Sequence, residues 1–323
     1  MRAAIYERNG PAREVLRVLE LPDPTPAAGE VLVRVHASGV NPSVVKKRAA
    51  TPLQFPRIVP HSDGAGVIEA AGEGVSRARV GERVWLWNAQ WNRAWGTAAE
   101  LIALPQEQAV PLPAGLSFEQ GATFGIPLQT ALAALLPFDA LAGAWVLVQG
   151  GTGAVGRFAI QAAKRLGARV IATAGSAAKA ALSLAAGADH AVNYREEDVV
   201  AKVRALTAGS GVDRIVEVEF GQNAGADVEM LRASHGTIAV YGSANLKDAR
   251  LEVRRLMFKN AAVRFLLVYD LSAPDRAAVL QAVAQLAPGL QTDVAERYPL
   301  QEIGPAHEAQ ESGRVVGNIV LLP

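Results

Sequence analysis

The chain has 323 residues, in which 32 lysines and arginines nearly balance 31 aspartates and glutamates. A formal net charge of +1 gives no electrostatic reason to expect nucleic acid or an anionic membrane as the main partner, and the absence of cysteine excludes disulfides and thiolate metal sites. Charges interrupt residues 1–20 and no apolar run approaches a membrane span, so we expect a soluble, cytoplasmic protein with no signal peptide.

The N-terminal part of the chain predicts strands and loops. Val31, Val33 and Val35 alternate with other residues, which is the period-two pattern of a half-buried strand. Short apolar runs cut by glycine follow at 64–72 and 81–85, and prolines punctuate the whole stretch. These features predict a small, irregular, β-rich domain.

From Ala144 onward the chain alternates short apolar runs with amphipathic stretches. The predicted strands are 145–148, 170–173, 191–193, 214–218, 237–241 and 263–268, and 155–166 and 179–186 are examples of the predicted helices. This alternation favours a doubly wound parallel sheet. Two helical patterns, 275–287 and 301–312, and a final strand, 318–322, complete the chain.

The strand at 145–148 runs into Gly151-x-Gly153-x-x-Gly156, and an amphipathic helix follows. In this motif the first glycine permits a tight turn, the second lets the backbone approach a pyrophosphate, and the third lets the helix pack on the strand. The helix N-terminus, beginning with Ala154 and Val155, then offers N–H groups to phosphates. The motif therefore predicts a dinucleotide site, and a glycine turn without a ligand is the alternative.

The end of the second strand predicts which dinucleotide binds. An NAD site usually places an acid there for the ribose 2′-hydroxyl, but this chain reads Ala174-Gly175-Ser176, with Lys179 three residues on. A hydroxyl, backbone N–H groups and a lysine attract a 2′-phosphate, so we expect NADPH rather than NADH. The alternative for Lys179 is an ordinary solvated position on a helix.

With this site placed, the whole chain resembles the zeta-crystallin and quinone oxidoreductase branch of the medium-chain dehydrogenases/reductases. The resemblance runs end to end through short blocks in a fixed order: Gly39-Val-Asn-Pro42, Ser62-Asp-Gly-Ala-Gly-Val-Ile-Glu-Ala-Ala-Gly72, Gly125-Ile-Pro-x-x-Thr130, Gln149-Gly-Gly-Thr-Gly-Ala-Val-Gly156, Thr173-Ala-Gly-Ser176, Gly242-Ser243 and Gly317-x-Ile-Val-Leu321. It implies an α/β fold in which a GroES-like β-rich substrate domain, residues 1–124 and 269–323, surrounds a Rossmann NADPH-binding domain, residues 125–268. It also implies a homodimer or a homotetramer.

The resemblance assigns roles to individual positions. Asn41 and Thr130 are expected near the nicotinamide and the substrate carbonyl, as the catalytic pair. The residues expected to bind the cofactor are Gly151, Gly153, Ala154, Val155, Gly156, Gly175, Ser176, Lys179, Tyr194, Ser243, Phe265, Leu267 and Asn318. Asn318 stands where relatives often carry a basic group.

Metal is not expected. Zinc-binding relatives use a cysteine near residues 41–44, a Gly-His-Glu block and a lobe of four cysteines, and this chain lacks every cysteine. Aligning Gly64-Ala-Gly66 puts Ser62 where those relatives have histidine, so His61 is interpreted as a loop or core residue. Glu217 and Glu219 suggest either an acid–base pair or, as the preferred interpretation, a charge pair at a strand end or a contact to a ribose.

Two departures from the family bear on the substrate. Tyrosines that line the family's quinone pocket are replaced here by Lys46 and Pro52. Four tryptophans gather within eleven positions, and Trp87, Trp91 and Trp95 could form a binding wall for a large flat substrate. Packing of the small domain or of a subunit interface is the alternative for these tryptophans.

The expected activity is hydride transfer from NADPH to a small-molecule quinone or activated C=C, an enone or enal, without metal. Asparagine and threonine polarise a carbonyl only weakly, which suits a substrate that carries its own electron sink. The alternatives are an enoyl-thioester reductase, with Lys46, Lys47 and Arg48 as a phosphate patch, and a non-catalytic NADPH-binding protein.

Overall fold

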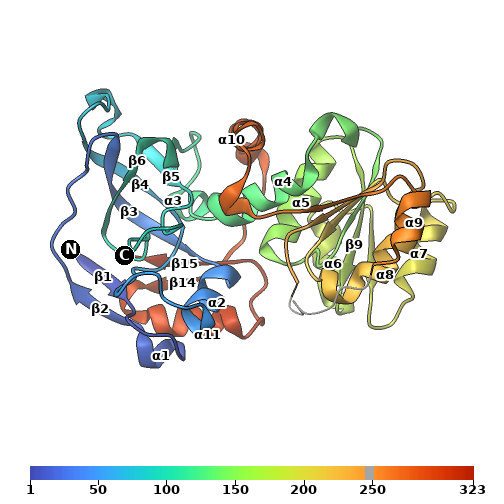
Figure 1. Ribbon diagram of the computed structural model, residues 1–323, viewed down its shortest axis with the longest axis horizontal. Coiled ribbons are helices and arrows are strands. Elements are labelled where there is room, and N and C mark those ends of the chain that lie inside the picture. The colour runs from blue at the N-terminus through green and yellow to red at the C-terminus, as the bar shows by residue number, and fades with distance from the viewer. Residues whose placement is uncertain (244–250) are drawn as a thin grey trace. The chain divides into compact units, whose positions relative to one another are not determined.

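Both ends of the chain contribute to the first of two units in the computed structural model, which describes residues 1–243 and 251–323 (Figure 1). The first unit comprises Met1–Pro127 and Thr292–Pro323, and the second comprises Leu128–Gln291. The units change at Pro127 and Gln291, and the domain boundaries expected at 124 and 268 stay a prediction.

A seven-stranded sheet organises the first unit, with the order β14-β15-β3-β4-β5-β7 and with β6 paired to β3. Valines 31, 33 and 35 are buried whereas Arg34 and His36 are exposed, so the predicted period-two strand is confirmed. A separate antiparallel pair joins β1 and β2. The strands are β1 (Arg2–Ile5), β2 (Arg17–Glu20), β3 (Glu30–Val40), β4 (Asp63–Ala71), β5 (Arg83–Leu86), β6 (Leu101–Pro105), β7 (Ala109–Pro111), β14 (Val294–Pro299) and β15 (Asn318–Leu322).

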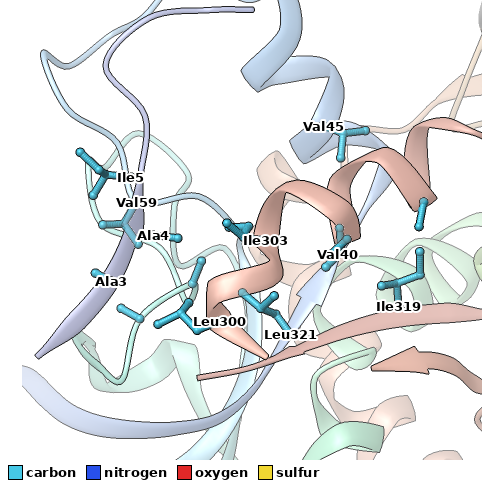
Figure 2. Packing of buried hydrophobic residues seen from close by; sticks show 14 residues of the cluster. Ala3, Ala4, Ile5, Val40, Val45, Val59, Leu300, Ile303, Ile319 and Leu321 are labelled. Atoms are coloured by element: carbon cyan, nitrogen blue, oxygen red, sulfur yellow. The ribbon is translucent and has the colours of Figure 1, made fainter. Parts of the chain in front are cut away.

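The C-terminal strand β15 lies between the edge strand β14 and β3. Ile319 on β15 is paired with Val40 on β3, antiparallel, and the other edge of β15 pairs with β14. One hydrophobic core forms beneath these strands, and Figure 2 shows Ile303 of helix α11 and Leu321 of β15 in the same cluster as Ala4 and Ile5. The two ends of the chain therefore share one core.

Four α-helices belong to the first unit, and the sequence analysis predicted only the last of them, α11. They are α1 (Ala12–Val15), α2 (Pro42–Ala50), α3 (Phe118–Gly121) and α11 (Ile303–Glu311); short 3-10 turns lie at Arg77–Arg79, Gln106–Gln108 and Leu300–Glu302, and a π-helical turn spans Phe124–Leu128. Helix α2 begins directly after Asn41, with Pro42 at its first position and with Val44 and Val45 buried. Its start fixes the backbone at the candidate catalytic asparagine.

The second unit is built on a six-stranded parallel sheet with the order β10-β9-β8-β11-β12-β13. The strands are β8 (Trp145–Val148), β9 (Arg169–Ala174), β10 (His190–Asn193), β11 (Arg214–Glu217), β12 (Thr237–Val240) and β13 (Ala262–Phe265). All six predicted strands occur within a few residues of their expected ends. The strand order reverses between β8 and β11, which is where doubly wound sheets bind ligands.

Helices cover both faces of this sheet (Figure 1). Helices α7 and α8 share a core with β8 and β11, whereas α4 packs against α5. The helices are α4 (Gln129–Leu135), α5 (Ala154–Arg165), α6 (Ala177–Ala185), α7 (Val199–Leu206), α8 (Phe220–Met230), α9 (Val253–Phe258) and α10 (Ala273–Leu286), with 3-10 turns at Phe138–Leu141, Val268–Asp270 and Ala287–Gly289. The predicted combination of a doubly wound parallel sheet and a β-rich unit is confirmed. Among the described residues, no helix is long and apolar enough to cross a membrane.

Candidate active site

The glycine motif forms a tight turn between β8 and α5. Gly150 adopts the left-handed conformation (φ 68°), so the residue before the motif, rather than Gly151, makes the turn. A Cβ on Gly156 would lie 2.3 Å from the Gly150 carbonyl oxygen, so the helix can pack this closely only with glycine there. Gly153 is the N-cap of α5 and provides no side-chain acceptor, so the first-turn N–H groups face outward for a ligand.

Polar side chains behind the turn hold it to the sheet. The Gly150 N–H donates to Thr173 Oγ1 at 3.1 Å, and the Thr173 hydroxyl donates to Gln149 Oε1 at 2.7 Å. Gln149 Nε2 in turn donates to Asp227 Oδ1 on α8 at 3.1 Å. The position of the turn therefore depends on a buried carboxyl group that the sequence did not single out.

Asp227 forms a buried acid pair with Glu217, the last residue of β11. Neither side chain has measurable solvent exposure, and the two carboxyl groups lie close enough to interact electrostatically. Burial, followed by the mutual repulsion of the two acids, raises the pKa of Asp227, and burial raises the pKa of Glu217. The pair therefore shares a proton at neutral pH; Asn223 Nδ2 donates to Glu217 at 3.2 Å.

The ends of β9 and β10 form a basic, hydroxyl-lined corner. A Cβ on Gly175 would lie 2.6 Å from the Tyr194 hydroxyl and 3.5 Å from Arg195 Nε, so these side chains stand directly over Gly175. Ser176 caps α6 by accepting from the Lys179 N–H at 3.3 Å. The sequence analysis missed Arg195, although a basic residue directly after Tyr194 was a signal that could have found it.

The remaining predicted cofactor residues are dispersed. The Ser243 hydroxyl donates to Glu219 Oε1 at 3.2 Å and accepts from the Gly221 N–H at 3.0 Å, near the end of β12. Phe265, the last residue of β13, and Leu267, two residues after the strand, are 67% and 51% exposed. Asn318 belongs to the first unit, where its side-chain amide donates to the Asp293 carbonyl oxygen at 3.2 Å.

Asn41 lies at the junction of β3 and α2, and its side chain is almost fully buried. Its Nδ2 donates to Asp63 Oδ2 at 2.7 Å, and the Ile126 N–H donates to the same oxygen at 2.9 Å. Burial raises the pKa of Asp63 to about 8, against the smaller opposing effect of these two hydrogen bonds. Thr130 lies on α4 in the second unit and is also buried.

A buried hydrogen-bond chain runs beside Asp63, from Thr97 through Ser38 and His61 to His307. Thr97 Oγ1 donates to the Asp63 carbonyl oxygen, which can only accept. Ser38 must then donate to Thr97 (2.8 Å) and accept from His61 Nδ1 (2.8 Å). His61 Nε2 therefore accepts from His307 Nε2 at 2.9 Å, which leaves His307 Nδ1 as a buried acceptor with no hydrogen-bond partner.

The rings of His61 and His307 are both neutral. Burial lowers the pKa of His61 to about 3, and burial, the neighbouring His61 and Arg48 lower that of His307 well below its ordinary value. His61, interpreted from sequence as a loop or core residue, is fully buried here. Within the described residues, no three histidine, aspartate or glutamate side chains converge in a way that could hold a metal ion.

The tryptophans of the first unit divide between core and surface. Trp85 is core, with an edge contact to Phe124, whereas Trp87 Nε1 donates to the Glu107 carbonyl oxygen at 3.1 Å. Trp91 is half-buried in the loop, and Trp95 is 44% exposed and lines a cavity of about 540 Å³. Their expected role in substrate binding stays a prediction.

The basic triplet on α2 does not form one exposed patch. Arg48 is buried and pairs with Glu311, and Lys47 Nζ donates to Gln90 Oε1 at 3.0 Å. Lys46 alone of the three is exposed. A phosphate-binding patch made of all three side chains, as considered for a thioester substrate, therefore does not exist in this structure.

Sequence comparisons agree with this geometry. Residues 27–114 match the family described as the alcohol dehydrogenase GroES-like domain, and residues 154–285 match the family described as zinc-binding dehydrogenase. The quinone oxidoreductase of Rattus norvegicus is 33% identical over 327 residues, covering 98% of this chain and 96% of the relative. The chain belongs to the quinone oxidoreductase branch of the medium-chain dehydrogenase/reductase superfamily.

Two further members show the range of this family. The structure of Escherichia coli quinone oxidoreductase, solved in complex with NADPH, is 27% identical with a TM-score of 0.87 and covers all of both chains. A 2-haloacrylate reductase from a Burkholderia species is 29% identical over 338 residues, covering 100% of this chain and 99% of the relative. The predicted family and GroES-like plus Rossmann fold are confirmed, and this quinone oxidoreductase-like chain is an enzyme of the oxidoreductase class.

Proposed function

We propose that this NADPH-dependent oxidoreductase reduces a quinone or an activated C=C of an enone or enal. The observation that carries the proposal is the corner at the ends of β9 and β10, where Tyr194 and Arg195 stand over Gly175. Lys179 follows in the first turn of α6, and no acid ends β9. A carboxylate there would repel a 2′-phosphate, whereas a guanidinium and an ammonium attract one. The proposed cofactor is therefore NADPH.

The residues of the second unit fit the two ends of this cofactor. The uncapped N-terminus of α5, from Gly153 to Gly156, would hold the pyrophosphate, and Gly175 with Ser176 would hold the ribose phosphate. Ser243, Phe265 and Leu267 would line the nicotinamide side. When bound, NADPH supplies the hydride and the protein supplies binding and orientation.

Asn41 and Thr130 are the proposed contacts for the substrate carbonyl. Both are neutral hydrogen-bonding groups, so each stabilises a developing negative charge only moderately. The chain has no cysteine, so it lacks the thiolate ligands by which zinc-binding relatives hold their metal. A quinone or an activated alkene suits this site because the substrate itself delocalises the charge, and water can then supply the proton.

The decisive experiment is an NADPH-oxidation screen over quinones, enones, enals and enoyl-CoA thioesters, with NADH in parallel. We expect turnover with quinones or enones and a clear preference for NADPH. Turnover confined to enoyl-CoA would favour the thioester reductase, and tight NADPH binding with no oxidation by any acceptor would favour a non-catalytic binding protein.

Variants of the basic corner test the cofactor. Arg195→Ala and Lys179→Ala should each raise the KM for NADPH by about tenfold, because each removes a charge-assisted hydrogen bond, and should leave the KM for NADH unchanged. Lys202→Ala is the matched control, since that side chain lies on α7 and pairs with Glu197. An equal change for both cofactors would contradict the assignment.

A further inference from the structure

The carboxyl group of Asp63 faces Asn41, and nothing in the proposed reaction uses it directly. We infer that Asp63 is a positioning residue that fixes which end of the Asn41 amide is offered to the substrate. This inference rests on the proposed function, because it gives Asn41 a substrate to meet. It adds to the proposed catalytic residues one that acts through Asn41 and touches neither substrate nor cofactor.

The hydrogen bonds around Asp63 Oδ2 define the orientation of the Asn41 amide. That oxygen accepts from Asn41 Nδ2 at 2.7 Å and from the Ile126 N–H at 2.9 Å. With the acid proton on Oδ1, Oδ2 can only accept, so turning the amide over would bring Asn41 Oδ1 against an acceptor oxygen and lose a buried hydrogen bond. Asn41 therefore keeps its NH₂ group toward Asp63, and its second N–H and its carbonyl oxygen remain for a ligand.

The surroundings of Asp63 leave its side chain no alternative position. The residue has no solvent exposure, and a Cβ on Gly125 would lie 2.2 Å from Asp63 Oδ1, so only glycine fits there. On the backbone side, the Thr97 hydroxyl donates to the Asp63 carbonyl oxygen. Segments from β3, from the loop before β6 and from the π-helical turn thus converge on one residue.

The carboxyl group is also mostly protonated at neutral pH. Among the described residues, no charged group pairs with this carboxyl: its neighbours are Asn41, the Ile126 backbone and Gly125, none of which is ionisable. Burial accordingly raises the pKa of Asp63 to about 8. Because Oδ2 accepts two hydrogen bonds, the proton belongs on Oδ1, so asparagine is a neutral isostere of the protonated form.

The test compares Asp63→Asn, Asp63→Ala, Asn41→Ala and the double variant Asn41→Ala/Asp63→Ala in steady-state kinetics with the best substrate of the screen. Asp63→Asn should keep kcat within about threefold, because asparagine can still accept from Asn41, whereas Asp63→Ala should lower kcat about tenfold. The KM for NADPH should not change in any of them. In the Asn41→Ala background, Asp63→Ala should lower kcat no further, although it still lowers the melting temperature.

Thr97→Val is the matched structural control. It removes a buried hydrogen bond to the backbone of the same residue and leaves the Asp63 carboxyl in place. The variant should lower the melting temperature and keep kcat. If Thr97→Val lowers kcat as much as Asp63→Ala does, or if the two active-site substitutions are additive in kcat, Asp63 acts only through stability and the inference fails.

A measurement on the unaltered protein keeps the inference testable if Asp63→Ala does not fold. The side-chain amide signal of Asn41 in a ¹⁵N NMR spectrum should titrate as Asp63 ionises between pH 7 and 9. If the Asn41 amide signal does not respond to pH in the range over which Asp63 itself titrates, the inference is overturned. A separate result would count against the proposed role of Asn41 in the reaction: the Asn41 amide signal of the unaltered protein titrates, but the Asn41→Ala variant keeps its kcat.

Discussion

The first and second units both bury ionisable side chains, but the two clusters hold their protons in opposite ways. In the first unit, His61 and His307 belong to a hydrogen-bond chain in which each ring nitrogen is fixed as a donor or as an acceptor. Both rings must therefore be neutral. In the second unit, Glu217 and Asp227 bind to each other through a proton that they share. One cluster is disrupted by gaining a proton and the other by losing one.

This difference predicts that the stability of the two units depends on pH in opposite directions. A proton added to His61 Nε2 would set two N–H donors against each other, so acid weakens the histidine chain. Removal of the proton between Glu217 and Asp227 would leave two negative charges in a low-dielectric interior, so alkali weakens the acid pair. The contribution of each cluster to the free energy of unfolding can be measured by replacing one of its residues.

The largest effect is expected from Asp227→Ala. The substitution leaves Gln149 Nε2 without its acceptor and removes the partner of a buried Glu217, which should lower the free energy of unfolding of the second unit by about 3 kcal/mol. Because Gln149 holds Thr173 and through it the Gly150 N–H, NADPH should also bind more weakly. Chemical denaturation and a fluorescence titration with NADPH would measure the two changes. If neither the free energy of unfolding nor the affinity for NADPH changes, the acid pair stabilises neither the fold nor the nucleotide site.

A smaller effect is expected from Asp227→Asn, and it should depend on pH. The folded pKa of Asp227, about 9, lies far above its unfolded value, so its stabilising effect is complete at low pH and is lost as the pH rises toward 9. The asparagine variant cannot lose that proton. Its stability should come closest to that of the unaltered protein near pH 4, and the difference in favour of the variant should then grow by up to about 1.4 kcal/mol per pH unit toward pH 9. A difference that does not vary with pH in this range contradicts the shared proton.

The histidine chain should show the opposite sign in His307→Gln. The folded pKa of His61 lies near 3 and that of His307 is also depressed, so the unfolded chain binds more protons below pH 6.5 and the stability from these rings falls as the pH falls toward 3. Asp63 acts in the reverse direction between its ordinary pKa and about 8, so the variant must be compared with the unaltered protein at each pH. We expect His307→Gln to be less stable by about 1 kcal/mol at pH 7.5 and by less at pH 5 in urea denaturation.

The smallest effect is expected outside both clusters, at Trp95. Because this side chain is 44% exposed, Trp95→Ala should change the free energy of unfolding by about 0.5 kcal/mol or less. If the tryptophan loop binds substrate, the KM should rise about threefold without a change in kcat. Trp85→Phe, in the core, is the contrasting variant, since it should affect stability and leave the KM unchanged.

The sequence predicted what depends on local patterns. Alternation of Val31, Val33 and Val35, and the strand–glycine–helix sequence around Gly156, are readable because each residue's role depends on neighbours a few positions away. Helix α2 escaped prediction because a proline and three consecutive basic residues obscured its two buried valines. The partner of His61 lies 246 residues away at His307, and that of Gln149 lies at Asp227, so only the folded chain reveals them.

The position of β15 between β14 and β3 also constrains how the polypeptide is made. The second unit is continuous in sequence and can fold as soon as it leaves the ribosome, whereas β3 emerges long before its C-terminal neighbour exists. Until then the nascent chain exposes the backbone edge of residues 38–40 of β3, which only β15 covers, to any other extended segment. Truncation or slowed translation near the C-terminus would therefore yield an aggregation-prone product in which the nucleotide-binding half is already complete.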